Sequence, residues 1–355
     1  MKITNAMKSV LPLAVACALS VACSRSHDGA SKYEIVDLAS SELQLSGDGM
    51  LLGTPIQLTR AGDNLIITDT KADSFVHYVD LAAKVYAGQF LPKGQGPGDY
   101  RSPVLLSEIP GDSKHFMLSE PNGHRLMRME AVAGSPYLMR CVSTLQSPDD
   151  AWIVTPIADG RMVTTNGYVQ HYELLTLLNP DGSVDRHCGR RPAPASAFDQ
   201  PPMAMTAAFQ FDLRVSPDGK RIAAVGSMGE SAAFFRLEGD SIVTVSEFCN
   251  EAALPNSHFE NGNYYGVDGE SVMGFIYSAA NADGVYVLTS ERKLSDPDSY
   301  SGDRILIYDW DGNPVGEYHL DRRIRMFTAP DATGTLYAVT EDGCDPTLIE
   351  FHLPD

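Results

Sequence analysis

Residues 64–69 read Asn64-Leu-Ile-Ile-Thr-Asp69, an apolar β-branched segment that follows a Gly-Asp turn. Segments of the same kind recur five more times along the chain. They are His115-Phe-Met-Leu-Ser-Glu120, Arg161-Met-Val-Thr-Thr-Asn166, Arg221-Ile-Ala-Ala-Val-Gly226, Val285-Tyr-Val-Leu-Thr-Ser290 and Leu336-Tyr-Ala-Val-Thr-Glu341. Such segments are typical of half-buried strands, and their regular recurrence is typical of repeat architectures. The sequence therefore predicts an all-β fold, a six-bladed β-propeller with four-stranded blades.

Each recurring strand is predicted to be the second of its blade, because an apolar strand and a tight turn precede it. The predicted innermost strands are Pro55–Leu58, Val104–Ile109, Trp152–Ile157, Phe211–Val215, Gly274–Ser278 and Arg325–Thr328. Turns such as Asp159-Gly160 and Ser216-Pro-Asp-Gly219 contain the residues that relieve backbone strain in tight turns. The layout places one domain at residues 33–355.

The last blade has three strands in this layout, since the chain stops at Asp355, just after a third strand. An open strand edge recruits other chains, and proteins avoid it. The segment Tyr33–Leu38 has strand character and no other partner. We therefore expect Tyr33–Leu38 to pair with the strand that ends at Leu353 and to close the ring.

Two motifs resemble known families. Ser216-Pro-Asp-Gly-Lys-Arg-Ile-Ala223 is similar to the repeat motif of TolB-like propellers. Lys93-Gly-Gln-Gly-Pro-Gly-Asp-Tyr100 resembles a loop of exported six-bladed propellers common in Bacteroidetes, many of which are lipoproteins. The resemblance implies a six-bladed propeller of the cell envelope and supplies no catalytic residue.

The first 22 residues resemble a bacterial lipoprotein signal peptide, with the basic residues Lys2 and Lys8, a short apolar run, and Leu19-Ser-Val-Ala-Cys23 at its end. The resemblance implies lipid attachment at Cys23 and a flexible tether over residues 23–32. We therefore expect a cell-envelope protein anchored at the outer membrane. Ordinary cleavage near Ala22, which would release a periplasmic protein, is the alternative.

Charge and cysteine content narrow the classes of partner. The chain carries a formal net charge of −19, which disfavours nucleic acid and anionic lipid as partners and favours solubility as a monomer. Four cysteines follow Cys23: Cys141, Cys188, Cys249 and Cys344. An even number permits disulfides, in three connectivities. Because the first three fall at similar points of successive blades, too far apart for a bridge, we expect unpaired thiols.

Loop length suggests which face binds. The loops between blades, such as Gly88–Ser102 and Cys188–Gln210, are much longer than the turns of the opposite face. Binding sites are usually built on long loops, so we expect the long-loop face to hold the ligand. These loops also gather cations that suit carboxylate or phosphate: Lys93, Arg101, Arg190, Arg191, Arg322, Arg323 and Arg325. The alternative is that they pair with nearby acids such as Asp99 and Asp321.

Aromatic residues of the same loops could stack on a sugar or peptide, or could anchor the loops to the ring. The ligand candidates are Tyr100, Tyr264 and Tyr265. Trp152 and Trp310, which lie in or beside strands, are expected to pack inside the fold.

Metal and nucleophile signatures are weak. Nine histidines form no His-x-x-x-His pair, and no nucleophile elbow is present. Some propeller enzymes bind calcium in the channel through oxygen ligands, so the acidic and amide residues at the ends of second strands are weak candidates. They are Asp69, Glu120, Asn166 and Glu341. Hydrogen bonding at strand ends explains them better.

We therefore expect a binding or scaffolding propeller without cofactor, more plausibly than an enzyme, for a protein, peptide or glycan of the envelope. The alternative is a hydrolase or lyase with a divalent metal in the central channel.

Overall fold

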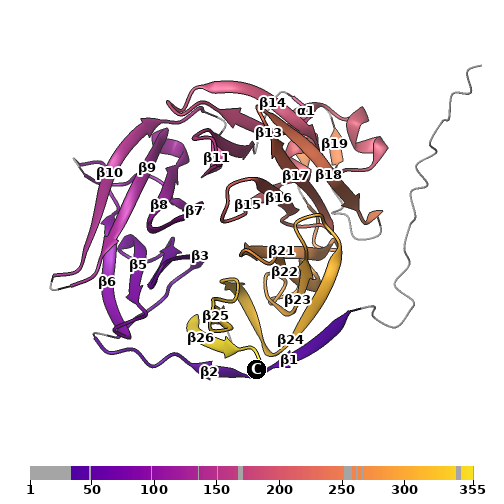
Figure 1. The fold of residues 1–355 in the computed structure, drawn as a ribbon. Coiled ribbons are helices and arrows are strands. Elements are labelled where there is room, and N and C mark those ends of the chain that lie inside the picture. Colours follow the sequence, from indigo (N-terminus) through magenta and orange to yellow (C-terminus); the bar gives the residue numbers. More distant parts are fainter. Residues whose placement is uncertain are drawn as a thin grey trace, which may run out of the picture. The chain divides into compact units, whose positions relative to one another are not determined.

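The computed structural model describes residues 33–47, 49–96, 98–134, 136–149, 151–166, 171–251, 258–260, 263–265, 267–340 and 345–354 (Figure 1). For residues 166, 207, 258–260 and 263–265 it describes the backbone alone. The predicted signal peptide, Cys23 and the tether at residues 23–32 lie outside the described residues, as do Glu341 and Cys344.

Four antiparallel sheets have four strands each, in sequence order from the innermost strand outward (Figure 1). The first contains β3 (Pro55–Ala61), β4 (Asn64–Asp69), β5 (Ser74–Asp80) and β6 (Val85–Pro92). The second contains β7 (Leu105–Ile109), β8 (Asp112–Glu120), β9 (Arg125–Val132) and β10 (Leu138–Gln146). The third contains β11 (Ala151–Pro156), β12 (Met162–Asn166), β13 (Glu173–Leu178) and β14 (Val184–Arg190). The fourth contains β15 (Phe211–Val215), β16 (Arg221–Gly226), β17 (Ser231–Glu238) and β18 (Ser241–Cys249). This is an all-β propeller with four-stranded blades.

The rest of the ring is an eight-stranded sheet. Its strands are β21 (Val272–Ala280), β22 (Val285–Lys293), β23 (Gly302–Tyr308), β24 (Pro314–Phe327), β25 (Thr335–Thr340), β26 (Thr347–His352), β2 (Ser40–Glu42) and β1 (Glu34–Leu38). The long strand β24 serves two sets of partners. Its first part pairs with β23, and its end, from Ile324 to Phe327, pairs with β25.

The pairing of the N-terminal segment differs from the prediction. Residues 34–38 do not pair with β26; they form β1, which runs parallel to β24 with Glu34 opposite Gly316 and Leu38 opposite Leu320. The strand next to β26 is β2, with Ser40 opposite Phe351. The prediction was wrong because an alternating pattern shows that a segment is a strand and does not show its partner.

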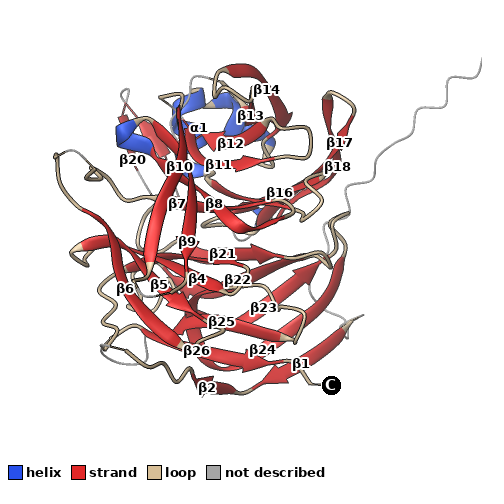
Figure 2. Cartoon of the chain, turned by 60° about the vertical axis from the view of Figure 1, so that its left-hand side comes forward, coloured by secondary structure: helices blue, strands red, loops and turns tan. Residues whose placement is uncertain are grey.

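Few other elements accompany the strands (Figure 2). They are the small hairpin β19 (His258–Glu260) and β20 (Asn263–Tyr265), the 3₁₀ turns η1 (Pro121–Gly123) and η2 (Ala195–Asp199), and the helix α1 (Pro202–Ala208). In the part of the chain that the structure describes, no helix is long and apolar enough to cross a membrane.

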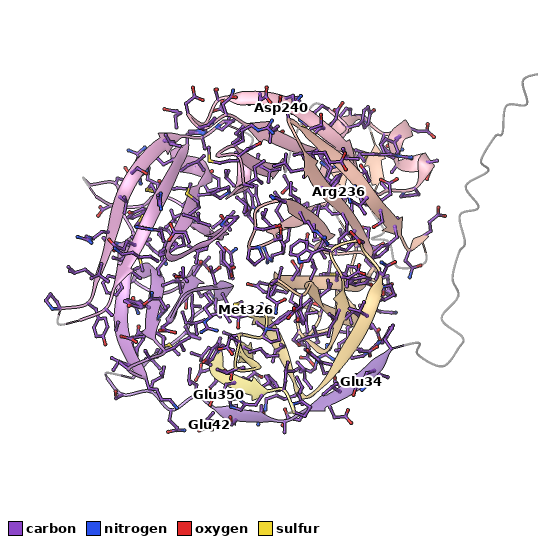
Figure 3. All side chains as sticks on the ribbon, viewed as in Figure 1. Glu34, Glu42, Arg236, Asp240, Met326 and Glu350 are labelled. Atoms are coloured by element: carbon purple, nitrogen blue, oxygen red, sulfur yellow. The ribbon has the colours of Figure 1, made fainter. Side chains whose placement is uncertain are left out.

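The core lies between neighbouring sheets. Every residue of β25 is buried, and β4 is buried from Leu65 to Asp69, because sheets cover both faces of each middle strand. In one cluster, Ile66 and Tyr78 of the first sheet pack with Phe116 and Met129 of the second. Burial of apolar surface contributes about 25 cal/mol per Å², so these contacts are the main stabilising force. Figure 3 shows Met326 of β24 near the centre of the ring, with Glu42, Arg236 and Glu350 at its periphery.

Turns that join first and second strands contact one another around the axis. Gly219, in the turn Ser216–Gly219, has a φ of +71°, and its carbonyl accepts a hydrogen bond from the Ala158 N–H at 2.9 Å. A Cβ on Gly219 would lie 2.5 Å from the Ala158 nitrogen, and a Cβ on Gly62 would lie 2.7 Å from the Ser113 carbonyl oxygen. Glycine at both positions therefore lets adjacent turns fit closely together.

Candidate functional site

A cavity follows the axis of the ring, between the innermost strands. Its narrow part, here called the passage, has a volume of about 40 Å³ and is lined by residues of every inner strand, among them Leu58, Thr155, Arg214 and Ser278. It widens into a funnel of about 520 Å³, which opens among the turns between first and second strands. Both parts are lined by Glu108, so the funnel and the passage are continuous.

Glu108 lies where the funnel narrows. It is the fourth residue of β7, water reaches its side chain, and protein surrounds the cavity that holds it. Burial raises the pKa of Glu108 to about 7, against the opposing charges of Arg214 and Arg60. Within the described residues, the Glu108 carboxyl makes no hydrogen bond or ion pair. It is therefore a free carboxyl group at the base of the funnel.

The two arginines near Glu108 are already engaged. Arg214 donates to the Ser278 carbonyl oxygen at 2.9 Å and to the Leu213 carbonyl oxygen at 2.7 Å, and its guanidinium lies 5.7 Å from the centre of the Tyr277 ring. Arg60 forms an ion pair of 2.6 Å with Asp331. These contacts occupy both guanidinium groups, and within the described residues neither forms a salt bridge with Glu108.

Two further titratable groups line or flank the passage. Burial raises the pKa of Asp212, which lies 3.9 Å from Arg214. Burial also raises the pKa of Tyr277 to about 12. The Tyr277 hydroxyl accepts from the Leu58 N–H at 3.0 Å and donates to the Leu58 carbonyl oxygen at 2.9 Å. Tyr277 thereby ties β21 to β3 across the ring.

The rim of the funnel carries three aspartates in different environments. Asp331 accepts from the N–H groups of Thr333 and Thr335, and Asp112 accepts from His115 Nδ1 at 2.9 Å and forms an ion pair with Arg128. Despite the opposing effect of burial, these bonds hold the pKa values of both carboxyl groups below their usual range. Asp63 is 71% exposed and lies 3.7 Å from Arg60. The rim is thus acidic and rigid.

Several of the cationic side chains predicted to bind an anion instead bind groups of the protein itself. Lys93 Nζ donates to the Thr70 carbonyl oxygen at 2.7 Å and to the Ala72 carbonyl oxygen. Arg191 is fully buried and donates to the Phe209 carbonyl oxygen at 2.6 Å, and burial lowers its pKa to about 10. Arg323 donates to Ser301 and lies 3.6 Å from Asp303. These three are not available to a docked ligand as they stand.

The remaining predicted cations lie nearer the surface. Arg190 is exposed and lies 5.2 Å from the centre of the Phe198 ring. Arg101 is exposed, and its backbone N–H donates to Glu120 Oε1 at 2.6 Å. Arg322 and Arg325 are partly buried on β24, and each has an interaction partner. Of the seven predicted cations, Arg101 and Arg190 are therefore the two that are exposed.

The aromatic candidates also differ in their surroundings. Tyr100 is 8% exposed, and the Arg125 guanidinium lies 5.1 Å from the centre of its ring, so Tyr100 anchors its loop. Tyr264 and Tyr265 lie on β20, and their side chains are outside the described residues. Trp310 is buried as expected, but Trp152 is 51% exposed, so the expectation that it packs inside the fold was wrong.

The weak metal candidates are strand-end residues. The Asp69 carboxylate accepts the N–H groups of Thr54 at 2.9 Å and Lys71 at 2.8 Å, and Glu120 forms an ion pair of 2.5 Å with Arg125. The side chain of Asn166 and all of Glu341 lie outside the described residues. Among the described residues, no group of three or more His, Cys, Asp or Glu could hold a metal ion.

The thiols that the structure describes are free, as predicted: Cys141 is exposed, and Cys188 and Cys249 are partly buried. Burial raises the pKa of Cys249 to about 11.

Sequence reasoning missed Glu108, Arg60 and Arg214 as residues of one cavity. A signal was present, because Glu108 and Arg214 are charged residues inside short, otherwise apolar innermost strands. A charged side chain at such a position raises the free energy of the folded state unless it faces water or a partner. On an innermost strand, water and partners are found along the axis of the ring.

The family described as TolB-like 6-blade propeller-like matches residues 37–331. The chain belongs to this family. Among curated proteins, none matches the sequence of this TolB-like propeller significantly.

Solved structures similar to this TolB-like propeller are distant in sequence. Raptor from Chaetomium thermophilum is 10% identical with a TM-score of 0.50, and the match covers 88% of this chain and 28% of that one. The β-propeller domain of Cps50 (Swd1) from Myceliophteria thermophila is 11% identical, with a TM-score of 0.44 and coverage of 89% and 100%. The PQQ-bound aldose sugar dehydrogenase from Streptomyces coelicolor is 14% identical, with a TM-score of 0.45 and coverage of 88% and 97%. At these identities the likeness shows the fold alone, and the chain spans little more than a quarter of the length of Raptor.

Proposed function

We propose that this TolB-like propeller is a binding or scaffolding protein whose partner, a protein, peptide or glycan, docks in the axial funnel. The observation that best supports this is the funnel itself, which has a volume of about 520 Å³ and a free carboxyl group at its base. Ligand sites are usually concave, largely preformed and fitted with a few polar groups. The propeller fold is compatible with such a role.

We further propose six blades, with the N-terminal segment closing the ring. The family description supports the number. In this interpretation the eight-stranded sheet is two blades that share β24, and β2 supplies the outermost strand of the second through its pairing with β26. Strand β1 then covers the outer edge of β24.

The location is likewise a proposal, and it rests on the sequence. We propose a Bacteroidetes lipoprotein that is anchored through Cys23 to the outer membrane, acts as a monomer and binds no nucleic acid. An acyl chain contributes about 0.8 kcal/mol of membrane affinity per buried CH₂ group, so Cys23→Ser should release the protein from the membrane fraction. Equal fractionation of the two forms would contradict the anchor.

A second candidate surface is the long-loop face. Trp152 is the second residue of the innermost strand β11. The residue before it, Ala151, pairs with Asn166 at the end of β12, so Trp152 lies toward the long-loop face. An aromatic side chain that is 51% exposed there is suited to stacking on a sugar or peptide. The funnel is preferred because it is a concave cavity with charged residues in its lining.

Capture of partners from envelope extract tests the choice of face. Asp63→Lys reverses a charge on the funnel rim, whereas Asp311→Lys reverses one in an outer turn. The two aspartates are matched, since each is exposed and lies 3.7 Å from an arginine. We expect the partner to be lost with Asp63→Lys and kept with Asp311→Lys. Loss of the partner with Trp152→Ala, but not with Asp63→Lys, would move the site to the long-loop face.

A further inference from the structure

Glu108 is unusual among the acidic residues of the ring interior. Asp69, Glu120, Asp112 and Asp331 each accept hydrogen bonds or pair with a cation. Within the described residues, Glu108 does neither, although it lies in a cavity. A carboxyl group that is held in a partly desolvated place without a partner costs free energy, and a bound cation would recover it.

The charges around Glu108 favour a cation over an anion. From β3, Arg60 faces it but is paired with Asp331; from β15, Arg214 faces it but is bound to two carbonyl oxygens and lies near Asp212. β21 contributes the neutral Tyr277. Carboxyl groups in or beside the cavity outnumber guanidinium groups. The carboxyl groups are Asp63, Glu108, Asp112, Asp212 and Asp331, and the guanidinium groups are Arg60, Arg128 and Arg214.

The size of the passage selects the kind of cation. A volume of about 40 Å³ holds a small head group and excludes a ring. The wall of the funnel that leads to it includes Ile109, Pro110, Val215 and Pro217, an apolar lining that suits methylene groups. Lysine has this form, a compact ammonium on an apolar stem that commonly lies along apolar surface.

We propose that Glu108 receives the ammonium group of a lysine side chain that a bound peptide inserts through the funnel. This inference rests on the proposed function and names its ligand class. The lysine stem lies against the apolar wall of the funnel, the Glu108 carboxylate at its base accepts the ammonium, and Asp63 on the rim attracts the approaching peptide.

Binding should strengthen as pH rises. An ammonium pairs with ionised Glu108, and the pKa of about 7 leaves that carboxyl mostly neutral at pH 5.5 and mostly ionised at pH 8. His115 is a further titratable group on the rim, so His115→Gln serves as the control for pH effects that do not come from Glu108. If Glu108 is responsible, His115→Gln keeps most of the pH dependence and Glu108→Gln removes it.

The experiment measures binding of three fluorescein-labelled peptides by fluorescence polarisation at physiological salt. They carry one central lysine, Nε-acetyllysine or glutamate. We expect only the lysine peptide to bind wild type, with an affinity about tenfold or more lower for Glu108→Gln. Glu108→Asp keeps the charge and should retain binding. Glu247→Gln removes an exposed carboxyl of β18 and controls for the acidity of the whole protein.

Equal binding of the lysine and acetyllysine peptides, or equal affinities of wild type and Glu108→Gln, would overturn the inference. The proposed function fails separately. If the partner captured from extract still depends on Asp63 while the lysine peptide does not depend on Glu108, the funnel remains the site and lysine recognition is rejected. If neither Asp63→Lys nor Glu108→Gln has an effect, both proposals are rejected.

Discussion

The two ends of the ring use charged side chains in opposite ways. On the long-loop face, Lys93 and Arg191 bind backbone carbonyl oxygens, and Asp69 binds backbone N–H groups. On the funnel face, the turns are short and contain glycines and aspartates that bind their own turns, and Glu108 has no partner among the described residues. Long loops are held in place by side chains that bind the backbone, whereas tight turns are stabilised by hydrogen bonds within the turn. Loop length and an unpaired charge therefore favour different faces of this protein as the binding surface.

Asp69→Ala should have the largest effect on stability, a loss of about 4 kcal/mol in the free energy of unfolding, because it leaves four partly buried backbone N–H donors unpaired. Burial alone would raise the pKa of Asp69, but its backbone hydrogen bonds hold it below the usual range. The stabilisation is therefore present above the pKa of an unfolded aspartate and is lost as pH falls through the folded value. Urea unfolding between pH 7 and pH 3 measures both effects.

The exposed residue Asp73, in the same loop, provides the control for Asp69. Asp73→Ala should change the free energy of unfolding by less than about 0.5 kcal/mol. Equal losses from the two substitutions would show that carboxylate bonding does not hold the long-loop face.

Gly219→Ala should cost about 2 kcal/mol and distort the funnel, because φ is +71° and the new Cβ would meet the Ala158 backbone. Gly160→Ala is the matched control, with a φ of +85° and nothing within 4 Å of the new Cβ. It should cost about 1 kcal/mol, from backbone strain alone. Similar thermal unfolding of the two variants would show that contact between turns does not stabilise the funnel.

Glu108→Gln should stabilise the protein by about 1 kcal/mol at pH 8, after allowance for the water that reaches the side chain. A carboxyl whose pKa is raised on folding destabilises the folded state once pH exceeds the pKa of the unfolded form. The gain should vanish below about pH 3.5, where the carboxyl is largely protonated in both states. A loss of stability at pH 8 would mean that Glu108 has a structural partner, and the contrast between the two faces would fail.

Arg190→Ala should have the smallest effect, less than about 0.5 kcal/mol, since the side chain is exposed and contacts one aromatic ring. Partner capture should be unchanged. If this substitution abolishes capture while Asp63→Lys preserves it, the long-loop face is the binding surface after all.

The repeating strands were predictable because they depend on local pattern. Segments such as Asn64–Asp69 and Arg221–Gly226 combine β-branched residues with a preceding turn, and both are strands with those bounds. The partner of β1 was not predictable, since strand pairing depends on distant residues such as Gly316.

The candidate site was less predictable for a similar reason. Glu108 and Arg214 were correctly placed on innermost strands, but their shared cavity appears only when the strands are assembled around the axis. Trp152 is a second position at which the sequence was misleading. Its apolar character suggested burial, but its position at the strand end leaves it exposed.

The pairing of Ser40 with Phe351 joins strands from nearly opposite ends of the sequence. That contact cannot form during synthesis until almost the whole polypeptide has emerged, and contacts between such distant residues form slowly. Until then, the N-terminal strand β2 lacks its partner, and its edge can pair with other molecules. The time between synthesis of the first and last strands is therefore a period of aggregation risk for this protein, and any factor that shields the N-terminal strand during that time should raise the folding yield.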